Sequence, residues 1–292
     1  MRQTTRTTDV PQRDTARPDA TRTLRLGRPA ARDFPERPAV LAGVDLTFMT
    51  QFLAAFGEEP DHARYEGGGG NSFISMAGRL LDGLDRPLPP LDKVVLAYHV
   101  PDMSIVEVAG CYLAERCPGN PEVFSLSGQG VGAPFTALRV LSGLHTARQL
   151  TEGAVLVMDQ STLPYYDADT HTGPSTDCAV LLGVGSAGGH GSMELDFVDE
   201  RAVGPDAAAG LLIERGHGPR TMTVVGRTLA DLLDPLPRAG GDLVEGASDL
   251  LCTSAWAALA EHWAPDRYTV VADYDPHSGR LFRAGLRPGA AS

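Results

Sequence analysis

The groups best suited to chemistry lie in the second half of this 292-residue chain. Cys252 precedes an apolar helical segment, where a thiol can act as a nucleophile if a base lies nearby. Asp273, Asp275 and His277 follow closely along the chain and are the residue types of a carboxylate–imidazole acid–base site. Both features also have structural interpretations, Cys252 as a small apolar filler and Asp273–His277 as a polar turn. The sequence alone leaves these alternatives open.

The spacing of the other ligand-type residues does not favour a metal or a cofactor. Cys111 and Cys117 are six residues apart, which is not a zinc-binding spacing. Asp167, Asp169 and His171 carry metal-capable groups, but no predicted strand or helix fixes their positions, which favours a solvated loop. We therefore expect no metal and no cofactor.

Composition and charge exclude several classes of protein. Hydrophobic residues make up 42% and charged residues 21%, as in globular proteins with a sizeable core. The net charge of −12 argues against nucleic acid as a partner, because phosphates require a basic surface. The chain has no apolar run of about 18 residues, so we expect no membrane-spanning helix. Its four cysteines and the lack of an apolar signal segment predict a reduced, cytoplasmic protein.

Short apolar runs alternate with segments of helical spacing from residue 39 onward, which predicts an α/β fold with a largely buried sheet. The expected strands are Lys93–Val100, Val123–Leu126, Gly153–Asp159, Asp177–Val184, Gly191–Val198, Thr221–Val225, Arg267–Asp273 and Arg280–Leu286. The expected helices are Ala39–Gly57, Asn71–Leu84, Ser104–Glu115, Pro134–Leu150 and Thr253–His262. The four glycines Gly67–Gly70 predict a flexible hinge. The glycine-rich stretch Ser127–Gly132 predicts a turn before a helix.

The first 38 residues differ from the rest in composition. They are rich in Thr, Arg, Pro and Asp and contain few apolar side chains. Such a segment buries too little to offset the entropy lost on ordering. We therefore predict a disordered tail over residues 1–38.

Four stretches, in this order and spacing, resemble the ketoacyl-synthase III branch of the thiolase superfamily. Leu91–Pro101 (LDKVVLAYHVP) is similar to an early strand of that family, and Phe124–Leu138 (FSLSGQGVGAPFTAL) to its nucleophile turn. Ser175–Leu182 (STDCAVLL) is similar to a later strand. Cys252–Leu259 (CTSAWAAL), followed by Arg267–Leu286, is similar to the family's last helix and closing hairpin.

The resemblance implies a five-layer αβαβα fold made of two related α/β halves. It places an N-terminal half at residues 39–190 and a shortened C-terminal half at residues 191–292. In this family a Cys at a helix N-terminus attacks an acyl thioester, where the helix dipole and backbone amides stabilise the thiolate and the oxyanion. A His and an Asn from the second half assist it.

The expected catalytic groups are not found at the matching positions. Counting along the helix places the nucleophile at Val131, and counting from the strand places it at Gly130, while Gln129 is a third candidate. The family's Asn corresponds to Cys252, and its His would fall in the segment 226–229, which contains none. We therefore predict that the Cys-His-Asn triad is missing.

Two functional hypotheses follow from the resemblance. The first is a non-catalytic subunit that pairs with and supports a catalytically complete ketosynthase or acyltransferase in fatty-acid-like or polyketide-like biosynthesis. Pairing, as a heterodimer or a homodimer, would use strand Val123–Ser127, and an acyl-carrier protein is a further possible partner. The second is an active acyltransferase or condensing enzyme that acts on acyl-CoA or acyl-carrier thioesters with Cys252 or the Asp273–His277 turn.

Overall fold

The structure is a computed structural model. It describes residues 23–36, 43–55, 57, 59, 70–104, 107–162, 175–186, 191–215, 220–233 and 241–289. Its strands are β1 (Arg25–Leu26), β2 (Ala30–Asp33), β3 (Lys93–Tyr98), β4 (Glu122–Leu126), β5 (Glu152–Asp159), β6 (Cys178–Gly185), β7 (Met193–Ala202), β8 (Thr221–Val225), β9 (Asp242–Glu245), β10 (Tyr268–Asp275) and β11 (Arg280–Pro288). Its helices are α1 (Gly43–Ala54), α3 (Phe73–Asp82), α4 (Ala109–Arg116), the short 3-10 helix η1 (Gly130–Gly132), α5 (Ala133–Thr146), α6 (Pro205–Arg215), α7 (Arg227–Leu232) and α8 (Ser254–Glu261).

The strands are hydrogen-bonded in the order β4-β3-β5-β6-β1-β7-β11-β10-β8-β9, and β2 pairs with β6 beside this path. In the N-terminal half, β3 runs parallel to β4 and β5, and β6 is antiparallel to β5. In the C-terminal half, β8 runs parallel to β9 and β10, and β11 is antiparallel to β7 and β10. The central strands β5 and β6 are mostly apolar and are buried along nearly their whole length, as expected for strands that helices cover on both faces.

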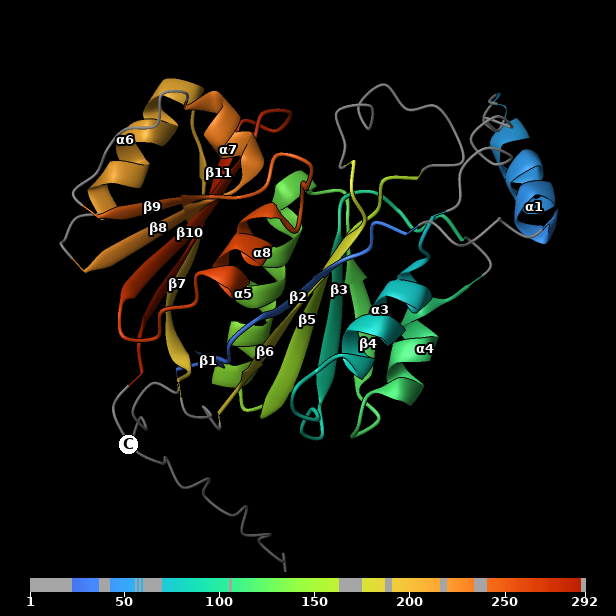
Figure 1. Cartoon of the computed structure of the whole chain (residues 1–292), viewed down its shortest axis with the longest axis horizontal. Coiled ribbons are helices and arrows are strands. Elements are labelled where there is room, and N and C mark those ends of the chain that lie inside the picture. The colour runs from blue at the N-terminus through green and yellow to red at the C-terminus, as the bar shows by residue number, and fades with distance from the viewer. Residues whose placement is uncertain are drawn as a thin grey trace, which may run out of the picture.

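Helices and strands form five layers (Figure 1). α5 and α8 lie in the middle: α5 contacts β3, β4 and β5 on one side and β7 and β11 on the other, while α8 contacts β8, β9 and β10. α3 and α4 cover the outer face of the N-terminal half, and α6 and α7 cover that of the C-terminal half. The main core lies around the central helices and includes Phe135, Trp256 and Phe282. The predicted αβαβα fold is confirmed.

The segment from Thr23 to Glu36 corrects the prediction of a disordered tail over residues 1–38, because it is part of the sheet. β1 pairs antiparallel with both β6 and β7 and so connects the two halves. Leu24, Leu26 and Phe34 are fully buried. Burial of these three apolar side chains and the strand pairing together hold the segment, although its average composition is polar. Residues 1–22 and 37–38 lie outside the described part of the chain.

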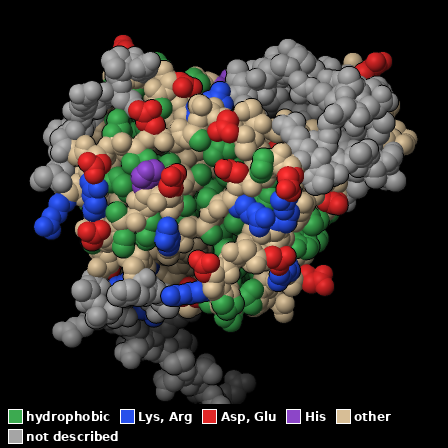
Figure 2. Space-filling model, in the orientation of Figure 1, with side chains coloured by type: hydrophobic (Ala, Val, Ile, Leu, Met, Phe, Trp, Pro, Cys, Tyr) green, Lys and Arg blue, Asp and Glu red, His purple; other side chains and the backbone are tan. Residues whose placement is uncertain are grey.

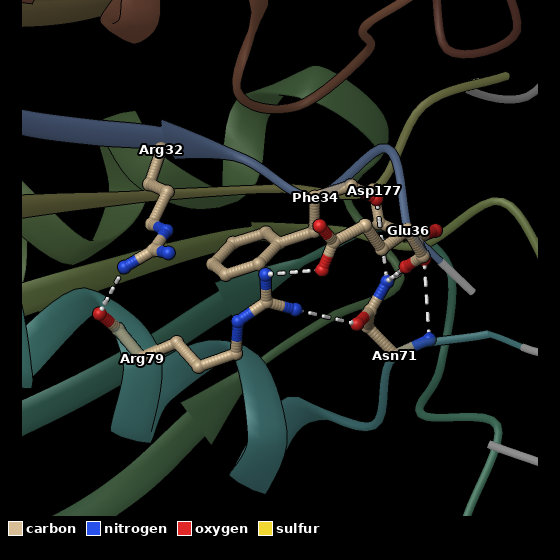
Figure 3. Close-up of polar contacts among 6 residues, drawn as sticks. All are labelled: Arg32, Phe34, Glu36, Asn71, Arg79 and Asp177. Carbon is tan, nitrogen blue, oxygen red and sulfur yellow. Dashed lines mark hydrogen bonds and ion pairs between the residues drawn. The ribbon is translucent and has the colours of Figure 1, made fainter. Parts of the chain in front are cut away.

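A polar cluster fastens this segment to α3 (Figure 3). The side-chain amide of Asn71 donates to the backbone oxygens of Phe34 (3.3 Å) and Glu36 (2.7 Å) and to Asp177 Oδ2 (2.9 Å). Arg79, on α3, donates to Asn71 Oδ1 at 3.2 Å, and its guanidinium lies 4.8 Å from the centre of the Phe34 ring. The cluster therefore satisfies buried polar groups while it holds the N-terminal strand in place.

Other expectations fall partly or wholly outside the described residues. These are the glycine run before residue 70 and the loop with Asp167, Asp169 and His171. The boundary between the halves at residues 190 and 191 stays a prediction. Among the described residues, no helix is long and apolar enough to cross a membrane. On the face shown in Figure 2, acidic and basic side chains are interspersed.

Candidate functional site

The turn from Ser127 to Gly132 leads from β4 into the central helix α5, as the sequence predicts. Gly128 and Gly130 have φ angles of +70° and +52°, which L side chains rarely adopt. Gln129 is half-buried, and its Oε1 accepts a hydrogen bond from Thr136 Oγ1 at 2.6 Å. The side-chain oxygen of Gln129 therefore already accepts a hydrogen bond from α5.

The closing hairpin packs directly onto this turn. A Cβ atom at Gly130 would lie 2.9 Å from Cγ and Oδ2 of Asp275, at the end of β10. A Cβ atom at Gly132 would lie 2.3 Å from the ring of Phe282, on β11. Real Cβ atoms essentially never approach so closely. The hairpin thus occupies the space into which side chains at positions 130 and 132 would project.

Val131, between these two glycines, is also buried. It is 3% exposed and belongs to the central apolar core. The three candidate nucleophile positions therefore hold a hydrogen-bonded amide, a glycine covered by a carboxylate and an apolar core side chain.

Cys252 lies beside the same turn, just before α8. Its Sγ is 3.9 Å from the backbone oxygen of Gly130, to which the thiol donates a weak hydrogen bond. Burial raises the pKa of the Cys252 thiol well above its usual range, and the nearby carboxyl groups of Asp159 and Asp273 raise it further. Such surroundings stabilise the neutral thiol and disfavour the nucleophilic thiolate.

Asp159 is a residue that the sequence reasoning missed. It ends β5, is fully buried, and accepts hydrogen bonds from the backbone N–H groups of Leu251 (2.7 Å), Cys252 (2.9 Å) and Thr253 (2.9 Å) and from Thr253 Oγ1 (2.6 Å). Burial raises the pKa of Asp159, whereas these hydrogen bonds oppose the rise. An Asp at the end of a fully apolar strand is the signal that could have identified it.

Asp273 lies on β10 against the start of α7. Its Oδ1 accepts from the backbone N–H groups of Leu229 (3.0 Å) and Tyr274 (2.8 Å). Its Oδ2 would be 1.9 Å from a Cβ atom at Gly226, so the carboxyl group fills the space beside the segment where the resemblance expects a His. Burial raises the pKa of Asp273 to about 8, with a smaller contribution from the carboxyl groups of Asp159 and Asp275.

His277 does not join this group through its side chain, which is exposed in the β10–β11 turn. Its backbone N–H donates to Asp275 Oδ1 at 3.0 Å, and Ser278 Oγ donates to Asp275 Oδ2 at 2.7 Å. These are the hydrogen bonds of a polar turn. The structure therefore brings together Gly130, Cys252, Asp273 and Asp275, and adds Asp159. Among the described residues, no group of three His, Cys, Asp or Glu side chains is placed to hold a metal ion.

The chain was compared with protein families, with curated protein sequences and with solved structures. No protein-family model matches the sequence, and no curated protein sequence matches it. Among solved structures, a tetronic acid condensing enzyme superposes with a TM-score of 0.62 at 17% identity, over 91% of this chain and 100% of that one. The 3-oxoacyl-(acyl carrier protein) synthase III of Pseudomonas aeruginosa superposes with a TM-score of 0.54 at 15% identity, over 93% and 100% of the two chains.

A variant of Xanthomonas campestris OleA with bound lauric acid and lauroyl-CoA superposes with a TM-score of 0.60 at 9% identity, over 92% of this chain and 100% of that one. The fold is thus thiolase-like, of the ketoacyl-synthase III type that condensing enzymes and acyltransferases share. At such low identities the similarity shows the fold alone, because function depends on the residues of the site.

Proposed function

We propose that this chain is a non-catalytic ketosynthase III-like subunit that pairs with and supports a catalytically complete ketosynthase or acyltransferase. Fatty-acid-like or polyketide-like biosynthesis is the setting that the resemblance implies. The observation that carries the proposal is the closed nucleophile turn, where Asp275 and Phe282 fill the space beside Gly130 and Gly132.

The chemistry of the neighbouring groups supports the same conclusion. Acyl transfer through a covalent intermediate requires a nucleophile, a base and donors for the oxyanion. Cys252 has a raised thiol pKa and two carboxyl groups nearby, which is the opposite of an activated cysteine. The start of α7 holds Gly226 and Arg227, beside a buried Asp273. In our proposal these residues stabilise the fold, and the chemistry takes place in the partner.

The position of β4 favours strand pairing with another chain. β4 is at one end of the strand order, where only β3 pairs with it among the described strands. Ser125 and Ser127 are exposed there, and Val123 and Phe124 are half-buried. An unpaired edge offers N–H and C=O groups to a second strand, so we propose that Val123–Ser127 pairs with a homologous subunit. An acyl-carrier protein would then deliver the acyl chain to the partner.

Sedimentation velocity tests this pairing. The purified chain is mixed with a catalytically complete ketosynthase III encoded in the same genome, and we expect a complex of the two chains. The Ser125→Glu and Ser127→Glu variants place carboxylates on the proposed interface and should abolish the complex. Ala207→Glu, on the exposed first turn of α6, is the control and should leave it intact. A wild-type chain that sediments separately from that enzyme would contradict the pairing.

One observation favours a second candidate, an active acyltransferase or condensing enzyme with relocated groups. Asp159, Asp273 and Cys252 lie together in the interior, and Asp273, with a pKa of about 8, carries a proton at neutral pH. A buried protonated carboxyl group can act as a general acid. This enzyme would act on acyl-CoA or acyl-carrier thioesters, and it requires acyl transfer by the chain alone.

A further inference from the structure

Helix α4 lies on the outer face of the sheet, over the edge strand β4 (Figure 1). A Cβ atom at Gly110, on α4, would lie 3.7 Å from Val123 Cγ1, so this side of the helix rests on β4. A helix with its side chains is about 10 Å wide, whereas neighbouring strands are only about 4.8 Å apart. A subunit that pairs along β4 would therefore meet α4 as well.

Contacts within the chain occupy the sides of α4 toward the core and toward α3. Leu113 is 1% exposed and packs in the core below the helix. Tyr112 faces α3, where a Cβ atom at Gly78 would lie 2.7 Å from its hydroxyl oxygen. Arg116 faces α3 too, since it forms an ion pair with Asp82. The opposite side of the helix is left free.

The free face of α4 consists of Val108, Cys111 and Glu115, which the helical spacing of three and four residues places in one row. All three are exposed, and Val108, at 61%, has the highest value among the exposed large apolar residues described. Glu107, which directly precedes Val108, is exposed as well. The centre of this face is thus apolar, with a carboxylate near each end.

The charges at this edge of the molecule are unbalanced. Among the described residues, neither Glu107 nor Glu115 forms an ion pair. The segment 107–127 contains three acidic residues and one base, so its net charge is −2. That base is Arg116, which already pairs with Asp82. Two carboxylates beside the β4 edge therefore lack a positive partner within this segment.

This charge distribution distinguishes between the possible partners. A second copy of the chain would bring the same two carboxylates and, from this segment, no unpaired base, and like charges across an interface repel. A subunit with Arg or Lys at the facing positions would instead form attractive pairs with Glu107 and Glu115 around the apolar centre. Charge complementarity thus favours a different chain over a second copy.

We propose that the free face of α4 is a docking surface for a homologous subunit that presents Arg or Lys side chains to Glu107 and Glu115 and apolar groups to Val108 and Cys111. This inference rests on the pairing along β4 proposed above and specifies its partner. The partner is a different chain with a basic contact surface, and not a second copy of this one.

Charge reversal tests the docking surface by sedimentation velocity of the full chain with the catalytically complete ketosynthase III. The wild-type chain alone should sediment as a monomer. Its complex with that enzyme should weaken as NaCl rises from about 0.05 to about 0.5 M, because salt screens exposed charges. Glu107→Lys combined with Glu115→Lys should raise the Kd of the complex about tenfold or more at low salt. Glu107→Gln combined with Glu115→Gln should raise it by a smaller factor.

Glu261→Lys combined with Asp266→Lys is the matched control, because it changes the net charge by the same amount at two exposed positions of the C-terminal half. This variant should bind the enzyme with the wild-type Kd. Thermal unfolding of all the variants should match that of the wild type, since substitutions at exposed positions have small effects on stability.

Alkylation of Cys111 by iodoacetamide gives a second readout, because the partner should cover this exposed thiol. Cys111 should react about tenfold more slowly in the complex than in the free chain. Ala207→Cys, on the exposed first turn of α6, supplies a control thiol that should react equally in both. Peptide mass mapping of this variant measures both rates in one sample.

The outcomes separate this inference from the pairing on which it rests. A complex that forms equally well with the wild type and with the charge-reversed chain, or in which Cys111 reacts as fast as in the free chain, overturns the inference and leaves the pairing along β4 standing. A wild-type chain that binds itself as tightly as it binds the enzyme overturns the choice of partner. A wild-type chain that forms no complex contradicts the pairing itself, and the inference fails with it.

Discussion

At the scale of single residues, the surroundings of Cys252 determine its chemistry. Four cysteines are present, and Cys111 is exposed whereas Cys117, Cys178 and Cys252 are buried. Burial raises the thiol pKa of Cys252 and of Cys178, and Asp159 contributes to both shifts. A cysteine activated for acyl transfer would instead have a lowered pKa and access to substrate. The resemblance suggested Cys252 as a relocated nucleophile, and its environment favours the structural filler.

We predict that iodoacetamide at about pH 8 alkylates Cys111 in the native chain and leaves Cys252 unmodified. The physical reason is that Cys252 is both inaccessible and held as the neutral thiol. Peptide mass mapping after timed alkylation measures the difference, and the urea-unfolded chain, in which all four thiols react, is the control. Modification of native Cys252 as fast as Cys111 would contradict this account.

The raised pKa of Asp273 predicts a dependence of stability on pH. Its pKa rises from the ordinary 3.8 to about 8, so between these values the folded chain holds a proton that the unfolded chain has released. This contribution to stability is complete below about pH 4 and is lost as the pH rises to about 8. The slope is at most about 1.4 kcal/mol for each pH unit.

Urea unfolding at several pH values between about 5 and 8.5 checks this prediction. The wild-type midpoint should fall as the pH rises through this range, and Asp273→Asn should show a shallower fall. A residual slope is expected in the variant, because burial also raises the pKa of Asp102 to about 7. Equal slopes for the two proteins would show that Asp273 does not hold the proton.

At the scale of elements, the N-terminal strand is the clearest structural correction to the sequence prediction. β1 is only two residues long, and neighbouring strands rather than its own pattern define it. Leu26 is 0% exposed in the core between the halves. Short elements of this kind are difficult to predict, because their stability comes from distant contacts rather than from local periodicity.

We therefore predict that Leu26→Ala lowers the free energy of unfolding by about 3 kcal/mol, as expected for a large-to-small change in a core. The exposed neighbour Arg28 provides the control, since Arg28→Ala should change stability by less than about 0.5 kcal/mol. Urea denaturation of the two variants measures both values. A Leu26→Ala variant as stable as Arg28→Ala would mean that the strand is dispensable.

The strands that could be predicted have a long apolar run, and the helices that could be predicted have a strong helical period. β5 was expected at Gly153–Asp159 and lies at Glu152–Asp159, since it is buried on both faces. β9, α6 and α7 were missed: β9 and α7 are four and six residues long, and α6 has 11 residues but is rich in alanine, with only a weak helical period. Helix α5 ends at Thr146 rather than Leu150, and Arg148 beyond it has a φ of 59°.

The candidate site was predictable to a similar extent. The glycine-rich turn, Cys252 and Asp273 could be identified from motifs along the chain. The contact between Asp275 and Gly130 could not, because it joins residues far apart in the sequence. The role of Asp159 was missed for the same reason, since its hydrogen-bond partners lie more than 90 residues away.

At the scale of the whole molecule, the two halves meet at the central helices, and the candidate site lies at this junction. The Ser127–Gly132 turn comes from the N-terminal half, and Cys252, Asp273 and the closing hairpin come from the C-terminal half. Packing of the hairpin onto the turn therefore fastens the halves together in the place where the fold's catalytic groups are expected. In our proposal this contact between the halves is structural and not catalytic.

The intact mass of the purified chain after incubation with acetyl-, malonyl- and lauroyl-CoA tests this account most directly. We predict an unmodified mass with every thioester, because no side chain at the turn is available for attack and the Cys252 thiol is neutral and buried. The Cys252→Ala variant, measured in parallel, should behave identically. A stable acyl adduct on the wild type that disappears in Cys252→Ala would contradict the non-catalytic role and identify Cys252 as a relocated nucleophile.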